Sequence, residues 1–184
     1  MPNDPNGPDV RDELARAYET MADGYGHAAK AEAIRLTNYQ KSLAIREVLL
    51  GQEPSSAKLQ RSVALSLLKV GAVSDPHRPE PTAAVRRAVA MLEALSAADP
   101  NDGRARREVG FAYYQLGNTL FGAGDFPGAL ASRQKAFAIR EQFAANDPQN
   151  AQARFDLAVA YTDLAEALTV TGQPGPAVEH ARQG

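Results

Sequence analysis

Residues 42–49 read "SLAIREVL" and residues 136–143 read "AFAIREQF", so this chain contains nearly the same octet twice. The two copies begin 94 residues apart, and a third version, "AVAMLEAL" at 88–95, stands midway between them. Each copy carries apolar residues four positions apart, which is the spacing of one face of an α-helix. A further apolar residue in each octet points to another side, so we predict a helix packed between two neighbours.

A second helical element alternates with the octets. Residues 13–22 ("ELARAYETMA"), 108–117 ("EVGFAYYQLG") and 156–165 ("DLAVAYTDLA") share an aromatic residue followed by an apolar and then a small one. Residues 62–71 ("SVALSLLKVG") form a weaker copy. A period of this length with paired helices predicts a repeat array, in which each helix pair packs on the next. The aromatic position is occupied by Tyr18, Leu67, Tyr113 and Tyr161.

The linkers between the units repeat as well. "ADPND" at 98–102 matches "NDPQN" at 146–150, and the Pro in each should end the preceding helix. Ser56, Asp102 and Asn150 stand at equivalent positions before the next helix, and all three residue types are good N-caps. We expect first helices (helices A) at 9–24, 57–72, 103–122 and 151–171, and second helices (helices B) at 28–50, 82–98, 126–146 and, as a short stub, 175–183.

The turns inside the units differ from one another. "GAGD" at 122–125 follows a helix rather than a strand, so we interpret it as a helix–helix turn and not as a phosphate loop. "GAVSDPHRPEP" at 71–81 carries three prolines and is expected to be an irregular loop.

The stretch "YYQLGNTLFGAGDFPGALASRQKA" at 113–136 resembles a tetratricopeptide repeat. That family has an aromatic residue, Leu-Gly, a large apolar residue, a Gly at the turn and two Ala in the second helix. Pro148 falls later than the family's usual Pro, so these units, about 46–48 residues long, exceed the norm of about 34. The matching positions are Tyr113, Leu116, Gly117, Leu120, Gly124, Ala129 and Ala136 in the third unit, and Tyr161, Leu164, Ala165, Leu168, Gly172 and Ala177 in the fourth.

The "AIRE" helices and the "AADP" linker look like the long-repeat variety often appended to bacterial serine/threonine protein kinases. The chain itself has none of the sequence motifs of a kinase. The resemblance implies an all-α, right-handed α-solenoid of antiparallel helix pairs with about three and a half repeats. Residues 1–8 would be an extended linker-like segment, and 9–184 a single repeat domain with units at about 9–56, 57–102, 103–150 and 151–184.

Composition excludes several classes of function. The formal net charge of −2 does not favour a nucleic-acid partner, and the lack of Cys excludes disulfides and thiolate metal sites. The chain has no apolar run long enough to span a membrane and no signal-peptide pattern at "MPNDPNGPDV", so we expect a cytoplasmic protein without membrane contact. The three histidines fall in different units without ligand spacing, so we expect no metal, no cofactor and no enzymatic activity.

The resemblance implies that helices A line a concave groove that binds a protein or peptide. Phe111 and Phe121 would give this groove an aromatic lining, but each could instead pack between units as core. Asp163 stands where carboxylate-clamping members of the family have an Asn, so we expect no such clamp. By the family's register the groove residues are Phe111, Tyr114, Asn118, Phe121, Val159, Thr162, Glu166 and Thr169.

Charged residues on the helices have a simpler interpretation. Arg46–Glu47 and Arg140–Glu141 are expected to form solvated charged faces. The densest basic patch, within "GRARRE" at 103–108, could meet an acidic partner, although solubility alone would also explain it.

Both ends of the array depart from the repeat. Residues 3–6, "NDPN", copy a linker although no helix B precedes them, and the last helix B, in "GPAVEHARQG" at 175–184, is about half the usual length. Solenoids normally have polar caps, so we expect either a piece of a longer array or ends that bury each other. The residues expected to be partly uncovered, as a possible end-to-end assembly surface, are Leu157, Leu164 and Leu168.

Two hypotheses of function follow from these patterns. The first is a non-catalytic scaffold of tetratricopeptide type that binds a protein or peptide, for example a kinase-associated one, in the helix-A groove. The alternative is a self-assembling subunit that stacks end to end into an oligomer or filament.

Overall fold

The computed structural model describes residues 7–26 and 29–182, and all of the regular structure in these ranges is α-helical. The segment expected at 1–8 lies mostly outside the described residues, and α1 already begins at Pro8. The predicted helix pairs are confirmed, most of them within two residues at each boundary. The helices are α1 (Pro8–Asp23), α2 (Ala29–Gln52), α3 (Ala57–Val73), α4 (Pro79–Ala98), α5 (Gly103–Gly122), α6 (Phe126–Asn146), α7 (Ala151–Val170) and α8 (Pro174–Ala181).

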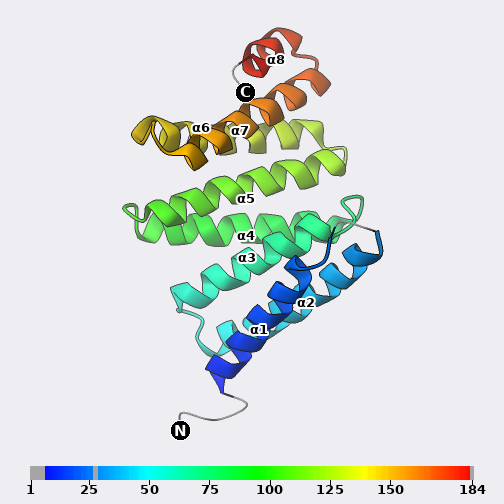
Figure 1. The fold of residues 1–184 in the computed structure, drawn as a ribbon, viewed down its shortest axis with the longest axis vertical. Helices are drawn as coiled ribbons and strands as arrows, with labels where there is room; N and C mark the ends of the chain where they lie inside the picture. The colour runs from blue at the N-terminus through cyan, green and yellow to red at the C-terminus, as the bar shows by residue number, and fades with distance from the viewer. Residues whose placement is uncertain (1–6, 27–28, 183–184) are drawn as a thin grey trace.

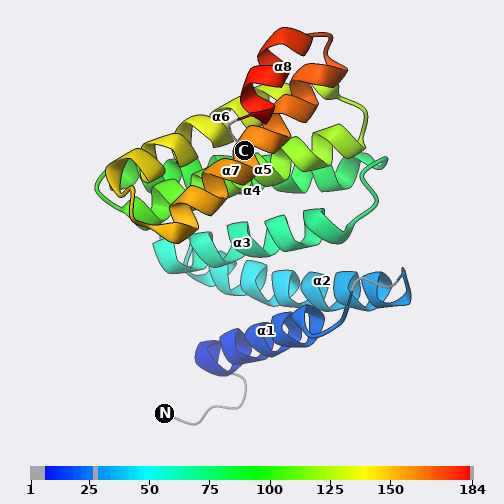
Figure 2. The same cartoon turned by 45° about the horizontal axis from the view of Figure 1, so that its top comes forward.

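The helices stack in chain order. Each one packs against the helix before it and the helix after it, and α3 also contacts α5 directly. Helices α1, α3, α5 and α7 form the layer nearer the viewer in Figure 1, with α2, α4 and α6 behind them. Figure 2 shows the same pairs following one another from α1 at one end to α8 at the other. This arrangement is an α-solenoid, with a helix-A face and a helix-B face.

The predicted N-caps are confirmed at α3, α5 and α7. The side chains of Ser56, Asp102 and Asn150 accept hydrogen bonds from the free N–H groups of the first turns, over 2.9–3.4 Å. The "GAGD" turn is a helix C-cap, in which Gly124 has a φ of 81° and the Asp125 N–H donates to the Leu120 carbonyl over 2.9 Å. These local contacts fix where each helix begins and ends.

The connection between α3 and α4 is shorter than predicted. An irregular loop containing the stretch 71–81 was expected between helices at 57–72 and 82–98, but α3 continues to Val73 and α4 begins at Pro79. Pro79 occupies the first helical position, where its missing N–H costs no hydrogen bond and its fixed φ suits the helix. The three prolines of this stretch therefore do not all mark loop residues.

The main core runs through the middle of the stack, from α2 to α6. Its fully buried large side chains include Val63, Leu68, Val85 and Leu92, which join α3 to α4. Gly71 lets these two helices approach closely, because a Cβ there would lie 2.3 Å from Cγ2 of Val85. The small position of the repeat is thus a close-packing position at Gly71.

A second, smaller core closes the far end of the stack. Leu164 and Leu168 are only 4% exposed, because Ala177 of α8 covers them while Leu130 and Phe137 of α6 pack on their other side. The expectation that these two leucines are uncovered is therefore wrong. Leu157, the third residue of that set, is half-buried on the first half of α7.

Candidate functional site: a cleft on the helix-A face

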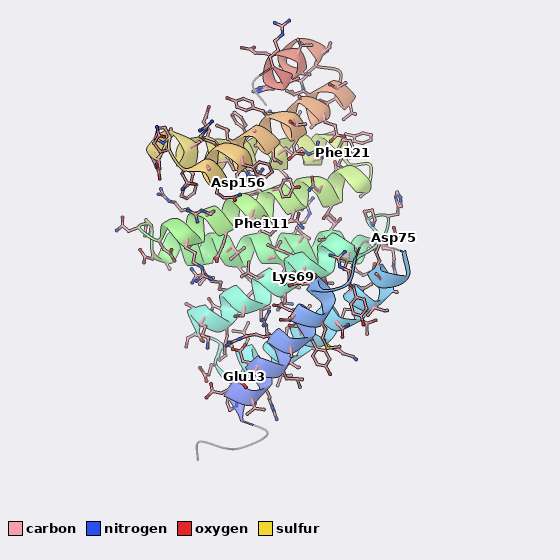
Figure 3. All side chains as sticks on the ribbon, viewed as in Figure 1. Glu13, Lys69, Asp75, Phe111, Phe121 and Asp156 are labelled. Carbon is pink, nitrogen blue, oxygen red and sulfur yellow. The ribbon has the colours of Figure 1, made fainter. Side chains whose placement is uncertain are left out.

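A cavity on the helix-A face lies between α5 and α7, with α6 as its floor. We call it the Phe111 cleft; it holds about 360 Å³. Phe111 on α5 is 44% exposed, and Figure 3 shows it on the same face as Asp156 of the neighbouring helix α7. The cleft is lined by Arg107, Glu108, Gly110, Phe111, Ile139, Arg140, Phe143, Asn150, Gln152, Ala153 and Asp156.

The floor of the cleft is apolar and deep because of one glycine. Gly110 on α5 sits against Ile139 of α6, where an added Cβ would meet Cγ2 of that residue at 2.9 Å. Ile139 and Phe143 of α6 are therefore reachable from the helix-A face. The ring of Phe111 lies 6.2 Å from that of Tyr114 and forms an aromatic edge to the same surface.

Positive charge surrounds this apolar floor. The guanidinium groups of Arg106 and Arg107 lie 5.8 and 5.3 Å from the centre of the Phe143 ring. Arg140 lies 4.6 Å over the Tyr114 ring and donates to the Asp156 carbonyl over 3.2 Å. Arg107 and Arg140 line the cleft, whereas Arg106 borders a neighbouring pocket, and among the described residues none of these three arginines forms an ion pair within 4.0 Å.

The acidic residues of the cleft accept hydrogen bonds from neighbouring side chains. Glu108 accepts from Arg61 over 2.8 Å and from Arg104 over 2.9 Å. Asp156 accepts from the amide of Gln152 over 2.8 Å. The cleft therefore combines an apolar floor with unpaired cations, which suits an apolar side chain next to an acidic group.

A second cluster, centred on Arg133, lies further along the helix-A face. Arg133 of α6 is buried and reaches between α5 and α7, where it donates to the Asp163 carbonyl over 2.7 Å and to Glu166 over 2.8 Å. It also contacts Asn118 Oδ1 at 3.4 Å and lies 4.6 Å over the Phe121 ring. This arginine holds the two helices together and was missed in the sequence, because the repeat pattern does not single it out.

Asp163 is the unusual group of this cluster. Its Oδ2 is buried and has no hydrogen-bond partner among the described residues. Burial raises the pKa of Asp163, and Glu166 adds to that effect, whereas Arg133 and Arg140 oppose it. A carboxylate oxygen that is buried without a hydrogen-bond partner loses its hydration without compensation, which disfavours the ionised form.

Most of the predicted groove residues belong to one of two groups, at the Phe111 cleft or around Arg133, and Thr162 belongs to neither. Phe111 lines the cleft and is too exposed to be core, while the half-buried Phe121 packs against the main core, as the alternative interpretation held. Tyr114 lies beneath Arg140 at the edge of the cleft. Thr162 is exposed and donates to the Ala158 carbonyl over 3.3 Å. The residues gathered around Arg133 are Asn118, Phe121 and Glu166.

The predicted solvated face at Arg46 is wrong. Arg46 is 6% exposed and donates to Glu19 of α1 and to Ser66 of α3, so it ties three helices together. The adjacent Glu47 pairs with the exposed Arg87 instead. The octet thus contains one structural arginine followed by one surface acid.

Other kinds of site are not apparent in the described part of the chain. No three His, Cys, Asp or Glu side chains there converge in a way that could hold a metal ion. Within the same ranges, no helix is both long and apolar enough to span a bilayer.

Comparison with known structures supports the fold. The chain is similar to BtubC from P. vanneervenii, with a TM-score of 0.65 and 16% identity over 96% of this chain and 63% of that one. It is also similar to MamA (41-end) from Desulfovibrio magneticus RS-1, with a TM-score of 0.53 and 20% identity over 97% of this chain and 73% of that one. The chain thus spans less than two thirds of the BtubC structure. These likenesses show a helical-repeat solenoid of the tetratricopeptide kind.

Comparisons with protein-family models and with curated proteins found no match. The resemblance to the kinase-appended variety therefore stays a prediction.

Proposed function

We propose that this protein is a non-catalytic scaffold that binds a segment of another protein on its helix-A face, centred on the Phe111 cleft. The observation that carries the proposal is the cleft itself: an exposed aromatic side chain beside an apolar floor, flanked by Arg107 and Arg140. Aromatic and Arg side chains around a desolvated pocket are the usual anchors of protein interfaces. Proteins associated with kinases, which the sequence resemblance suggests, are one kind of partner within this proposal.

The chemistry of the cleft favours a particular kind of segment. An apolar side chain would fill the space over Ile139 and Phe143, and an Asp or Glu beside it would meet Arg107 or Arg140. The Arg133 cluster would act as a support, because the two terminal guanidinium nitrogens of Arg133 already donate hydrogen bonds within the protein.

A displayed library of random peptides, selected on the full chain, tests this proposal. We expect enriched peptides that combine an apolar residue with an adjacent acid, and an affinity for Phe111→Ala at least about tenfold weaker, as for an interface anchor. Arg107→Glu should weaken binding and reduce its salt dependence. Phe126→Ala is the matched control, since Phe126 is an exposed aromatic residue outside the cleft.

The proposal fails if the selected peptides bind Phe111→Ala and Arg107→Glu as tightly as the native chain. It also fails if the library gives no enrichment over a parallel selection on Phe111→Ala.

A further inference from the structure

The free side of α1 carries an exposed apolar stripe made of Val10, Leu14 and Met21. These residues share one face of the helix, and the aligned repeats place them at the same positions as three residues of α5. All three equivalents are buried in α5, which packs against the preceding helix B, α4. The stripe on α1 therefore corresponds to the surface that, in a unit within the stack, packs against the preceding helix B. The equivalents in α5 are Ala105, Val109 and Leu116.

At the opposite end of the stack, α8 exposes the kind of surface on which a following helix A packs. Val178 on α8 is 52% exposed. Its equivalent in α6, 48 residues earlier, is Leu130. Leu130 packs against Leu164 and Leu168 of the following helix A, α7. Val178 therefore stands where a following helix A would pack.

The residues that would meet Val178 occur in this same chain. Met21 aligns with Leu164 in the repeat and is 52% exposed, and Tyr25, just beyond α1, aligns with Leu168 and is also exposed. We propose that a second copy of this chain docks its α1 on α8 and continues the stack in register, so that Val178 of one copy meets Met21 of the next. The two surfaces differ, so the contact is head to tail and closes into a ring or extends into a filament.

The first half of α7 provides room for the rest of α1. It borders an open trough of about 540 Å³ in which Phe155 is largely exposed. Val10 and Leu14 of the docked copy would lie over this trough, because they precede Met21 on the same stripe. Arg154 on the trough and the exposed Glu13 on α1 give the two surfaces opposite charge. The trough is lined by Ala151, Arg154, Phe155, Leu157, Ala158 and Tyr161.

This contact retains Leu157 from the assembly surface expected in the sequence and replaces the other two residues. Leu164 and Leu168 are buried within the chain, so they are not part of the surface between copies. Their packing inside one chain shows the kind of contact that we propose between two copies.

Cysteine cross-linking tests the proposed register directly, because the chain has no Cys of its own. Chains carrying Met21→Cys are mixed with chains carrying Val178→Cys and oxidised mildly. We expect covalent dimers in the mixture and few in either variant alone. Val48→Cys is the matched control, since Val48 is 53% exposed but lies on α2, outside both of the proposed docking surfaces. It should give few dimers with Met21→Cys.

Two results of this experiment would overturn the proposal. One is cross-linking of Met21→Cys chains to each other as readily as to Val178→Cys chains, which would indicate a front-to-front contact. The other is a mixture that gives no more dimer than the Val48→Cys control.

Reversible association is measured by size exclusion with light scattering over a hundredfold range of concentration. The native chain should gain mass with concentration, and Val178→Asp should associate at least about tenfold more weakly, because it buries an unpaired charge in the contact. Val48→Asp should behave like the native chain. A constant monomer mass for the native chain over the whole range contradicts the proposal. Thermal melting of each variant checks that it is folded.

Discussion

Arginines at equivalent positions of the repeat make different contacts in different units of this solenoid. Arg46 and Arg140 occupy the same place in two copies of one octet, yet Arg46 bonds to Glu19 and Ser66, whereas Arg140 lies over Tyr114 at the cleft. Their partners come from other helices, so the octet alone could not distinguish a buried arginine from a solvated one. The sequence therefore predicts where these residues lie along a helix but not what they contact.

The buried position of Arg46 leads to a prediction about stability. Arg46→Ala should lower the free energy of unfolding by about 3 kcal/mol, because it removes the buried cation next to the Glu19 carboxylate and leaves only the longer ion pair of 3.7 Å with Lys69. Arg87→Ala removes the cation of an exposed pair with Glu47 and should cost less than about 1 kcal/mol. Urea unfolding of both variants measures the difference, and equal losses would contradict the structural role of Arg46.

Asp163 provides a prediction about pH. Its pKa is raised in the folded state by burial, with Glu166 adding to the effect while Arg133 and Arg140 oppose it. The folded state therefore binds the proton more tightly than the unfolded chain does, and this contribution to stability is lost as pH rises from the unfolded value through the raised one. Asp163→Asn cannot ionise, so it should melt higher than the native chain at pH 7 and gain less at pH 4. A gain in melting temperature that is the same at both pH values would contradict this assignment.

The helices themselves follow closely from the local sequence. Their bounds depend on N-caps such as Asp102 and on turn glycines such as Gly124, which act within a few residues and can be recognised without a structure. The extra turn of α4 at Pro79 was not predicted, because proline is common both in loops and at the first position of a helix. The burial of Leu164 under α8 was not predicted for another reason: the eight residues of α8 are enough to bury it.

Close packing between α3 and α4 can be tested at Gly71. Gly71→Ala should destabilise the protein by about 1–3 kcal/mol, because the new methyl group would overlap Cγ2 of the rigid Val85 side chain. Gly51→Ala is the control: its Cβ would meet nothing within 4 Å, so it should stabilise α2 by about 0.4–1 kcal/mol. Thermal melting separates the two outcomes, and a neutral Gly71→Ala would mean that the helices adjust without cost.

At the scale of the whole molecule, the stack has a strong middle and weaker ends. The main core spans α2 to α6, whereas α1 and α8 are each covered on one side only and expose Val10, Leu14 and Val178. The repeat predicts this layout in general terms. The cleft between α5 and α7 could be anticipated only in part: Phe111 followed from the register, whereas the floor at Ile139 depends on how closely α6 approaches Gly110.

Hydrogen exchange should follow the same gradient. Amides of α1 and α8 should exchange through local opening well before those of α4 and α5, since the loss of an end helix leaves the remaining interfaces intact. Mass spectrometry of exchanged peptides measures this order. Under conditions of self-association, protection at α1 and α8 should rise, and protection of the middle helices should stay the same. Uniform exchange along the whole chain would indicate a single cooperative unit instead.

The chain-order packing described above also has a mechanical consequence. Because nearly every contact joins a helix to its immediate neighbours, a force applied between the two ends passes through each interface in series. The molecule should stretch elastically as the helix pairs tilt apart, and under greater tension should release them one pair at a time. Such a protein would act as a spring between whatever is attached to its two ends.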